Sequence, residues 1–415
     1  MIAFHFPPLA GSSGIQRTLR FVQHLPSLGW QPLVLSAHPR AFEATSADLL
    51  REVPPDTVVE RPFALDTSRH LAIAGRYPGF LALPDRWSTW ALGAVPAGLL
   101  MIRKYRPDVI WSTYPVATAH LIARRLHRLS GIPWIADFRD PMVQDGYPAD
   151  PAAWRAFQRV EQGAMRDAAK LVFVTPGAKD MYRARYPAMP ERGFEVIENG
   201  YDEESFTAAE KDVDTAPLNP GCFTLLHSGI VYPAERDPRA LFEALGRMRT
   251  AGVARIEQLR LRFRSPVHAE LLRKLAVETR TEALVEILPA IPYRDALQEM
   301  LRADGLLVMQ GANCNEQIPA KVYEYLRARR PILGLADPQG DTGKTMLEAG
   351  IAHVAMLEDT QRVEEAMTRF LAEVPAGSGA TPMGAGLAAM SRRARAGALA
   401  GLLEQARAQR AAAGA

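Results

Sequence analysis

Residues 316–326 read Glu-Gln-Ile-Pro-Ala-Lys-Val-Tyr-Glu-Tyr-Leu, and they follow the apolar run Gly305–Met309. The run has the length and composition of a buried strand, and the residues from Ala320 onward have the spacing of a helix. Pro319 fits the first turn of that helix, where its missing amide hydrogen costs nothing. The free amides of a helix start attract anions, and Lys321 adds a positive charge there. This stretch therefore predicts an anion-binding strand–loop–helix unit of an α/β fold.

Short apolar runs alternate with helical patterns in two series along the chain. In the first series we expect strands at Ile2–Phe6, Pro32–Ser36, Val109–Ser112, Trp134–Ala136, Leu171–Thr175 and Phe194–Ile197, and helices at Ile15–Leu28, Ala117–Leu129 and Pro151–Ala168. In the second series we expect strands at Phe223–His227, Leu259–Phe263, Leu284–Leu288, Gly305–Met309 and Ile332–Leu335, and helices at Pro238–Met248, His268–Thr279, Arg294–Arg302 and Ala320–Arg329. Strands separated by helices predict parallel sheets with helices on both faces.

The length of 415 residues allows two or three domains of about 100–200 residues each. Residues 199–200 are Asn-Gly, a turn signal, and residues 203–220 are polar and predict a linker or edge loop. We expect domains over 1–198 and 199–385, with a loop at 374–386. Residues 386–415 then predict an Ala/Arg/Leu helix that packs back toward the first domain.

Composition excludes several classes of protein. A hydrophobic fraction of 48% and a charged fraction of 23% are those of a globular chain, not of a disordered chain or a fibre. The net charge of +3 is too small to indicate a nucleic-acid partner. Cys222 and Cys314 form no disulfide framework and fit a reducing cytosol. The start of the chain lacks a signal-peptide pattern, and the longest apolar stretch, Trp90–Ile102, is too short to span a bilayer. We expect a cytoplasmic protein.

The spacing of Glu316 and Glu324 fits two interpretations equally well. One is a capped helix with solvated charges, and the other is a pair that binds a sugar. Glu316 and Glu324 are separated by seven residues, which resembles the Glu-x7-Glu signature of retaining glycosyltransferases of the GT-B fold. The sequence from Arg330 to Leu333 that follows is also typical of this group. The resemblance is to the family 4-like group, in its bacterial polysaccharide branch. It implies two Rossmann-like, doubly wound α/β domains that face each other across a cleft. It also implies an acceptor-binding first domain and a second domain that binds a nucleotide sugar, with Glu324 on the donor ribose and Glu316 near the donor sugar.

Two segments of the first domain are similar to the same family. Residues 6–17 resemble its first strand, glycine loop and helix, and Gly11 and Gly14 would let the backbone approach the donor closely. Taken alone, the loop is an ordinary glycine turn. Residues 133–141 place polar side chains at a strand end, where the resemblance implies a catalytic role for Asp140 and acceptor contacts for Asp137 and Arg139. A salt-bridged loop is the alternative.

Residues 227–238 resemble the first strand end of the family's nucleotide-binding domain. Gly229 and Arg236 would cradle the donor diphosphate, because a guanidinium can bind phosphate oxygens in a bidentate way. Asp237 reads as a cap of the next helix. The chain departs from the family at Ile230, where many relatives have Arg, and near 262–266, where a glycine is common. It also departs at residues 288–292, to which the resemblance gives a role in recognising the base and where Ala290 stands in place of a common glycine. The groups that remain to stabilise the leaving phosphate are Arg236, Lys321 and the helix start at Pro319.

The resemblance implies a retaining hexosyltransferase that moves a sugar from a nucleotide-diphosphate sugar, a co-substrate, to a hydroxyl of a glycan, a lipid-linked saccharide or a small molecule. No cofactor is expected. Two other classes remain open: a nucleotide-sugar epimerase of the same fold, and a non-catalytic partner in polysaccharide assembly. A group of basic residues indicates either a solvated helix face or contact with an anionic inner membrane. This group comprises Arg103, Lys104, Arg106, Arg124, Arg125 and Arg128.

Two further patterns resemble known sites without fitting them. Residues 340–345 look like a phosphate-binding loop, but Pro338 stands where the pattern requires glycine. Asp212 and Asp214 form an Asp-x-Asp pair, but they lie in the polar stretch after the first domain. The nine histidines have no metal-ligand spacing. We therefore predict that no metal is required.

Overall fold

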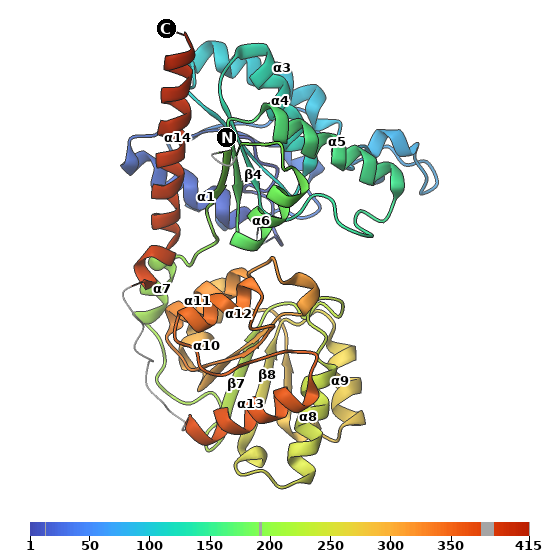
Figure 1. The fold of residues 1–415 in the computed structure, drawn as a ribbon, viewed down its shortest axis with the longest axis vertical. Helices are drawn as coiled ribbons and strands as arrows, with labels where there is room; N and C mark the ends of the chain where they lie inside the picture. Colours follow the sequence, from blue (N-terminus) through green and yellow to red (C-terminus); the bar gives the residue numbers. More distant parts are fainter. Residues whose placement is uncertain (13, 191–192, 375–385, 415) are drawn as a thin grey trace. The chain divides into compact units, whose positions relative to one another are not determined.

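The computed structural model describes residues 1–12, 14–190, 193–374 and 386–414. The chain forms two compact units, one of Met1–Glu198 with Arg392–Ala415 and one of Asn199–Ser391. Each is an α/β unit with parallel strands (Figure 1). In the part of the chain that the structure describes, every helix is too short or too polar to cross a membrane.

The amino-terminal unit is built on parallel strands between two layers of helices. Its elements are α1 (Ile15–His24), β1 (Leu33–Leu35), β2 (Val58–Glu60), α2 (Thr67–His70), α3 (Trp90–Tyr105), β3 (Ile110–Thr113), α4 (Ala117–Ser130), β4 (Trp134–Phe138), α5 (Pro151–Asp167), β5 (Lys170–Phe173), α6 (Pro176–Arg185), β6 (Phe194–Val196) and α14 (Arg392–Gly414). Strands β3, β4, β5 and β6 form one parallel sheet, and β1 pairs with β2.

The predicted strand Ile2–Phe6 is reduced to isolated bridges at Ile2. Ile2 makes parallel bridges to Leu35 of β1 and to Ser112 of β3, so it joins the two groups of strands. The ladder ends after Ala3, whose amide donates to the carbonyl of Leu35. Phe6 already donates back to the carbonyl of Phe4 in a turn, ahead of two prolines that have no amide hydrogen.

Side chains that alternate along the strands form two cores in this unit. Trp134, Ala136 and Phe138 pack on the face covered by α3, α4 and α5. Trp111 and Ile135 point to the other face, where Phe21 of α1 and Leu399 and Leu403 of α14 cover them. The last helix of the chain therefore completes the core of the first unit, as α14 lies beside α1 in Figure 1.

The second unit has a single six-stranded parallel sheet. Its elements are α7 (Glu203–Glu210), β7 (Phe223–Ser228), α8 (Arg239–Thr250), β8 (Leu259–Arg264), α9 (Ala269–Glu278), β9 (Val285–Leu288), α10 (Tyr293–Arg302), β10 (Gly305–Met309), α11 (Ala320–Ala328), β11 (Ile332–Leu335), α12 (Asp341–Glu348), β12 (Val354–Ala355) and α13 (Thr360–Glu373). The strand order is β12-β11-β10-β7-β8-β9, the doubly wound order of a Rossmann domain. Helices α8, α9 and α13 cover one face, and α7, α10 and α11 the other.

The order of connections reverses between β7 and β10, which pair in the middle of this sheet. In sheets of this type, ligands bind at the carboxyl ends of the strands at that point of reversal. The ends of β7 and β10 lead directly into residues 229–238 and 310–319. Both segments that the sequence predicts to bind the donor therefore start at one edge of the sheet.

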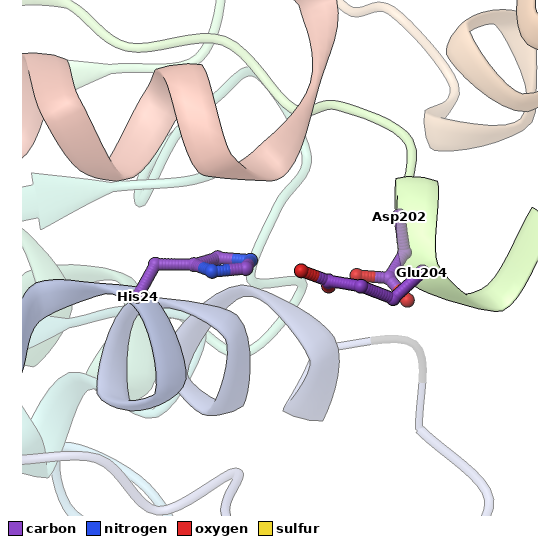
Figure 2. Close-up of side chains that lie close together, drawn as sticks. All are labelled: His24, Asp202 and Glu204. Atoms are coloured by element: carbon purple, nitrogen blue, oxygen red, sulfur yellow. The ribbon is translucent and has the colours of Figure 1, made fainter. Parts of the chain in front are cut away.

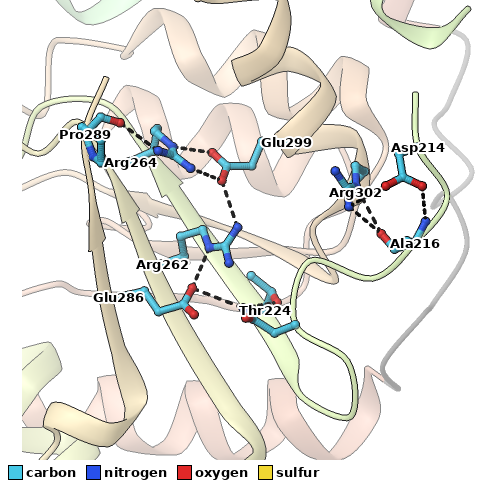
Figure 3. Close-up of polar contacts among 10 residues, drawn as sticks. Asp214, Ala216, Thr224, Arg262, Arg264, Glu286, Pro289, Glu299 and Arg302 are labelled. Carbon is cyan, nitrogen blue, oxygen red and sulfur yellow. Dashed lines mark hydrogen bonds and ion pairs between the residues drawn. The ribbon is translucent and has the colours of Figure 1, made fainter. Parts of the chain in front are cut away.

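Figure 3 shows why β8 ends in arginines where a glycine was expected. Arg262 donates to Glu286 at 2.6 Å and to Glu299 at 3.0 Å, and Arg264 donates to Glu299 at 2.8 and 2.6 Å. Arg264 also donates to the carbonyl of Pro289 at 2.8 Å. The two guanidinium groups thus tie β8 to α10 and to the segment that follows β9.

The prediction of a linker over 203–220 is wrong for its first half, which forms α7. Asp202 caps this helix by accepting from the amide of Ser205, and Phe206 and Ala209 are buried (Figure 2 shows Asp202 and Glu204 at the helix start). Two acidic residues of this helix, Glu203 and Glu210, both bind Arg327 of α11. Most of the loop predicted at 374–386 lies outside the described residues.

Candidate functional site

The carboxyl end of β7 carries the glycine expected to approach the donor. Gly229 has a φ of +120°, a conformation that favours glycine. A Cβ atom built on Gly229 would lie 2.9 Å from the Nζ atom of Lys321. The absent side chain therefore leaves room for the ammonium group of α11 beside the strand end.

Helix α11 is fixed against β7 by one of its faces. Lys321 and Tyr325 are four residues apart and so project from the same face. The hydroxyl of buried Tyr325 accepts from the amide of Ser228 at 2.8 Å, and Nζ of Lys321 lies 3.2 Å from Nε2 of His227. The helix begins after Pro319, and no side chain caps it. Its first amides are therefore directed to the edge of the sheet where β7 and β10 end.

The ammonium group of Lys321 lies in an unfavourable environment for a charge. Burial holds the pKa of Lys321 well below its ordinary value, and the positive charge of Arg236 lowers it further, whereas Glu324 raises it. Clustered positive charge with little solvent is typical of a site that binds an anion. An incoming phosphate would restore the missing negative charge.

Arg236 lies in the loop between β7 and α8. Its Nη1 atom donates to the carbonyl of Ile230 at 3.0 Å, its Nε atom lies 3.4 Å from Oε1 of Gln310, and its guanidinium sits 5.3 Å from the ring centroid of Tyr232. Gln310 is the first residue after β10. Arg236 thus bridges the two strand ends, and the backbone carbonyl of Ile230 is one of its acceptors.

Asp237 acts close to the helix start expected from the sequence. Its carboxylate accepts from the amide of Arg239 at 3.1 Å and also binds the guanidinium of Arg239. Pro238, not Asp237, is the cap residue of α8. The carboxylate of Asp237 is therefore bound within the loop that carries Arg236 and does not pair with its guanidinium.

Glu324 follows one turn after the start of α11. Its Oε1 atom accepts from the hydroxyl of Tyr293 at 2.7 Å, and Tyr293 is the first residue of α10. Tyr293 comes directly after the 288–292 stretch, to which the resemblance gives a role in binding the base. The contact therefore ties the predicted ribose-binding carboxylate to the predicted base-binding segment.

Glu316 is exposed in the short loop before α11. Neighbouring backbone groups hold this loop, because the amide of Asp341 donates to the carbonyl of Asn315 at 2.8 Å and the hydroxyl of Thr342 donates to the carbonyl of Gln317 at 2.8 Å. A Cβ atom on Gly343 would lie 2.1 Å from the carbonyl oxygen of Asp337. The segment that resembles a phosphate-binding loop thus packs tightly and supports the loop of Glu316.

Several polar side chains of the amino-terminal unit lie together at the carboxyl end of β4. Arg139 donates to the carbonyl of Gly14 at 2.9 Å, and a Cβ atom on Gly14 would lie 2.4 Å from Nδ1 of His5 and 2.7 Å from Nη1 of Arg139. The hydroxyl of Ser12 lies 3.3 Å from Nδ1 of His5. Burial and the charge of Arg139 lower the pKa of His5 to about 4, so the ring is neutral at pH 7. Gly14 therefore makes room for two polar side chains beside the glycine loop.

Asp137 holds this strand end together. Its side chain is fully buried and accepts from Arg17 at 2.8 and 3.0 Å and from Thr113 at 2.7 Å. Arg17 also donates to the carbonyl of Ile197 at 2.8 Å. The carboxylate of Asp137 is thus committed to internal contacts. Asp140, three residues later, is exposed at the same strand end.

The structure places the remaining predictions as follows. Gly11 has a φ of +78°, with open space where a Cβ would lie. Two members of the basic group, Arg124 and Arg128, pair with Asp167. The rejected metal pair is engaged in ion pairs, Asp212 with Arg294 and Asp214 with Arg302. His24, the last residue of α1, is drawn in Figure 2.

Sequence reasoning assigned no role to His227, Gln310 or Tyr293. His227 and Tyr293 contact residues 94 and 31 positions away in the sequence, so no local spacing reveals them. Within the second unit the structure therefore gathers Gly229, Arg236, Lys321 and Glu324 at neighbouring strand ends, with polar residues behind them.

Comparisons with known families and solved structures return one family match and several structures of similar fold. Residues 13–200 match the glycosyl transferase 4-like domain. A search among proteins of curated function returns no match. Among solved structures, the sucrose-phosphate synthase from Thermosynechococcus elongatus is similar with a TM-score of 0.63 and 16% identity over 99% of both chains. The glycosyltransferase WaaG, involved in lipopolysaccharide biosynthesis, is similar with a TM-score of 0.56 and 12% identity over 98% of both chains.

An epimerase also has this fold. The UDP-GlcNAc 2-epimerase from Neisseria meningitidis, solved with UDP-GlcNAc bound, is similar with a TM-score of 0.54 and 11% identity over 97% of this chain and 99% of the epimerase. At these identities the comparisons establish the fold alone. They confirm the predicted α/β fold of two Rossmann-like units of the GT-B type, and residues 13–200 carry the glycosyltransferase match.

Proposed function

We propose that this protein is a retaining glycosyltransferase that moves a hexose from a nucleotide-diphosphate sugar to an acceptor hydroxyl, in the synthesis of a cell-surface polysaccharide. The observation that carries the proposal is the group of Arg236, Lys321 and Glu324 at the strand ends where the sheet order reverses. The match of residues 13–200 to the glycosyl transferase 4-like domain supports the same reaction. The Glu-x7-Glu resemblance supports retention and the polysaccharide branch.

The chemistry required of this site is stabilisation of a leaving diphosphate. As the bond from the anomeric carbon to the phosphate oxygen breaks, negative charge grows on the diphosphate and positive charge grows on the sugar. Arg236, Lys321 and the first amides of α11 would bind the diphosphate, since preplaced donors stabilise developing charge most effectively. No reorganisation of α11 is needed, because Tyr325 and Lys321 already fix it to β7.

The two glutamates would bind the rest of the donor. Glu324 would accept hydrogen bonds from the ribose hydroxyls, and Glu316 would contact the sugar. In the amino-terminal unit, Gly11 and Gly14 would approach the donor, and Asp140 would have a catalytic role. Asp137 and Arg139 would lie on the acceptor side. Asp137 would hold that strand end in place through Arg17. We name no enzymic nucleophile and no cofactor.

The decisive experiment joins binding to turnover. Thermal unfolding is measured with a panel of nucleotide diphosphates and their sugars, because a ligand that binds the folded state raises the midpoint. The best donor is then incubated with candidate glycan, lipid-linked and small-molecule acceptors, and the anomeric configuration of the product is determined by NMR. Product with the donor's configuration supports the proposal, and an inverted product contradicts retention.

An epimerase is the second candidate, because the Neisseria enzyme with UDP-GlcNAc shares the fold. The donor incubated without acceptor distinguishes the two, since only an epimerase forms a new sugar isomer. The third possibility is a non-catalytic partner, suggested by Ile230 in place of arginine. Nucleotide-sugar binding without turnover in a complete acceptor mixture would support that function instead.

Contact with an anionic membrane is a further part of the proposal. Ile73 is 84% exposed and Phe80 is 71% exposed in a segment that also carries Arg69 and Arg76. Exposed apolar side chains among basic residues fit a negatively charged lipid surface. Sedimentation with vesicles of anionic and of zwitterionic lipid tests this contact, and equal binding to both would contradict it.

A further inference from the structure

His227 is a buried polar side chain with two defined contacts. It lies on β7 with no exposed surface. Its Nδ1 atom is 3.0 Å from the carbonyl oxygen of Leu307, and its Nε2 atom is 3.2 Å from Nζ of Lys321. The ring therefore sits between the neighbouring strand β10 and the start of α11.

The contacts with the carbonyl of Leu307 and with Lys321 favour one state of the imidazole ring. The backbone of Ile230 also lies beside the ring and, like Leu307, raises the pKa of His227. A carbonyl oxygen only accepts hydrogen bonds, so the hydrogen of a neutral ring is on Nδ1, facing Leu307. Nε2 is then an acceptor, which can receive a hydrogen from the ammonium group of Lys321. A protonated ring would instead direct a positive charge at Lys321. The pKa of His227 lies well below its ordinary value, first because of burial and then because of Lys321, which agrees with a neutral ring.

We propose that His227 is a positioning residue that holds the Lys321 ammonium group in place and in its charged form at the diphosphate site. This inference rests on the proposed function and names a role that the sequence motif did not give to His227. The ring itself does not reach a ligand, because it is fully buried. It acts through Lys321, and Gly229 leaves the space in which the two groups meet.

The charge on Lys321 needs this support. Burial and the nearby Arg236 both favour the neutral amine, and Glu324 is the carboxylate that opposes them. A hydrogen bond from the ammonium to Nε2 favours the charged form, because an imidazole acceptor replaces lost water. Arg236 and Lys321 are also the charged groups that lower the pKa of His227. Without the acceptor, Lys321 would lose its proton at a lower pH.

Two substitutions separate this role from simple packing. His227→Asn keeps a donor toward Leu307 and removes the acceptor near Lys321, whereas His227→Gln can place an amide oxygen close to the position of Nε2. The probe is inorganic pyrophosphate, which requires no knowledge of the base or sugar, and its dissociation constant is measured by calorimetry. We expect His227→Asn to weaken binding about tenfold at pH 7.5 and His227→Gln to stay within about threefold of the native protein.

The pH dependence provides a readout that packing alone would not change. The ratio of the dissociation constants of His227→Asn and the native protein cancels the titration of pyrophosphate itself. We expect this ratio to rise between pH 7 and pH 9, as Lys321 loses its proton in the variant first. In a Lys321→Met background the His227→Asn substitution should have no further effect on pyrophosphate binding, because the coupling between the two residues is gone.

The outcomes separate this inference from the proposed function. If the native protein binds neither pyrophosphate nor any nucleotide diphosphate, the proposed function is wrong. The positioning role is wrong, and the proposed function stands, if the native protein binds pyrophosphate and the two His227 variants do not differ from each other. That holds whether both variants bind pyrophosphate as tightly as the native protein or both lose the same affinity. The native protein offers a test without substitution, since ¹⁵N shifts must show the hydrogen on Nδ1 at pH 7. A hydrogen on Nε2, or a protonated ring, would overturn the inference.

Discussion

The hydroxyl of Tyr293 donates a hydrogen bond of 2.7 Å to the carboxylate of Glu324. Tyr293 begins α10, and Glu324 lies one turn into the neighbouring helix α11. Tyr293 directly follows the segment expected to bind the base, and Glu324 is the residue expected to bind the ribose. Under the proposed function, this contact would link the residues that bind the base and the ribose of one nucleoside.

We expect Tyr293→Phe to weaken binding of the preferred nucleotide diphosphate about three- to tenfold. The substitution removes one hydrogen bond to a charged group, and the partial exposure of Tyr293 reduces the effect. Calorimetry with the nucleoside diphosphate and with pyrophosphate measures it. The loss should appear with the former only, so an equal loss for pyrophosphate would contradict this role.

Substitution of Glu324 and of Arg236 should affect different kinetic constants. Glu324→Ala should weaken donor binding by about one to two decades, because the ribose loses a charged hydrogen-bond acceptor. Arg236→Ala should mainly slow transfer, because the guanidinium acts on charge that develops as the diphosphate leaves. Steady-state kinetics with varied donor separates KM from kcat. Unchanged constants in both variants would refute the site.

The buried pair of Arg17 and Asp137 should matter for stability more than for catalysis. Asp137→Asn leaves the guanidinium of Arg17 without its bidentate partner, which should destabilise the protein by about 3–5 kcal/mol. Chemical unfolding followed by circular dichroism measures this loss. Glu404→Gln, which removes an exposed partner of Arg407, should change stability by less than about 1 kcal/mol. A normal unfolding midpoint with a raised acceptor KM would instead support acceptor contact by Asp137.

Glu299 should make stability depend on pH. Burial raises its pKa, but the contacts with Arg264 and Arg262 outweigh burial, so the pKa lies below the ordinary value of 4.5. The carboxylate therefore stabilises the folded state above that pH, and this contribution is lost as the pH falls through the lowered pKa.

Glu299→Gln should lower the free energy of unfolding at pH 7 and flatten its dependence on pH between about 3 and 5. Unfolding in urea across this range tests the prediction. Glu270→Gln, at the exposed pair with Arg273, is the matched control and should leave the slope unchanged. An unaltered slope in Glu299→Gln would show that the ion pair does not control acid stability.

The alternating strands and helices could be predicted because the spacing of apolar residues that indicates them is found within each short segment. Strand Gly305–Met309 has the predicted bounds, and Ala320–Ala328 ends one residue early. The α7 helix was missed because its carboxylates have no partner nearby in the sequence and therefore look solvated. Their partner in the folded protein is Arg327, which lies over a hundred positions later in the chain. Helix α3 was missed because the apolar run from Trp90 contains Pro96, which the helix tolerates.

The candidate site was predicted where a motif contains the chemistry and was missed where distant segments supply it. Gly229, Arg236, Lys321 and Glu324 stand in two short motifs, each at the end of one strand. His227 lies inside one of those motifs, but its role depends on Lys321 and on the carbonyl of Leu307 in another strand. The acceptor contact of Asp137 stays a prediction from the resemblance, and spacing did not reveal its partner Arg17.

Helix α14 gives the amino-terminal unit a dependence on the end of the chain. Leu399, Leu403 and Ala406 of this helix cover Trp111 and Ile135 of the first sheet. During synthesis the ribosome makes that sheet first and this cover last, after the whole second unit. The first unit must therefore wait, with an apolar face uncovered, until the second unit and α14 have been synthesised, and a nascent chain at that stage is a natural substrate for chaperones.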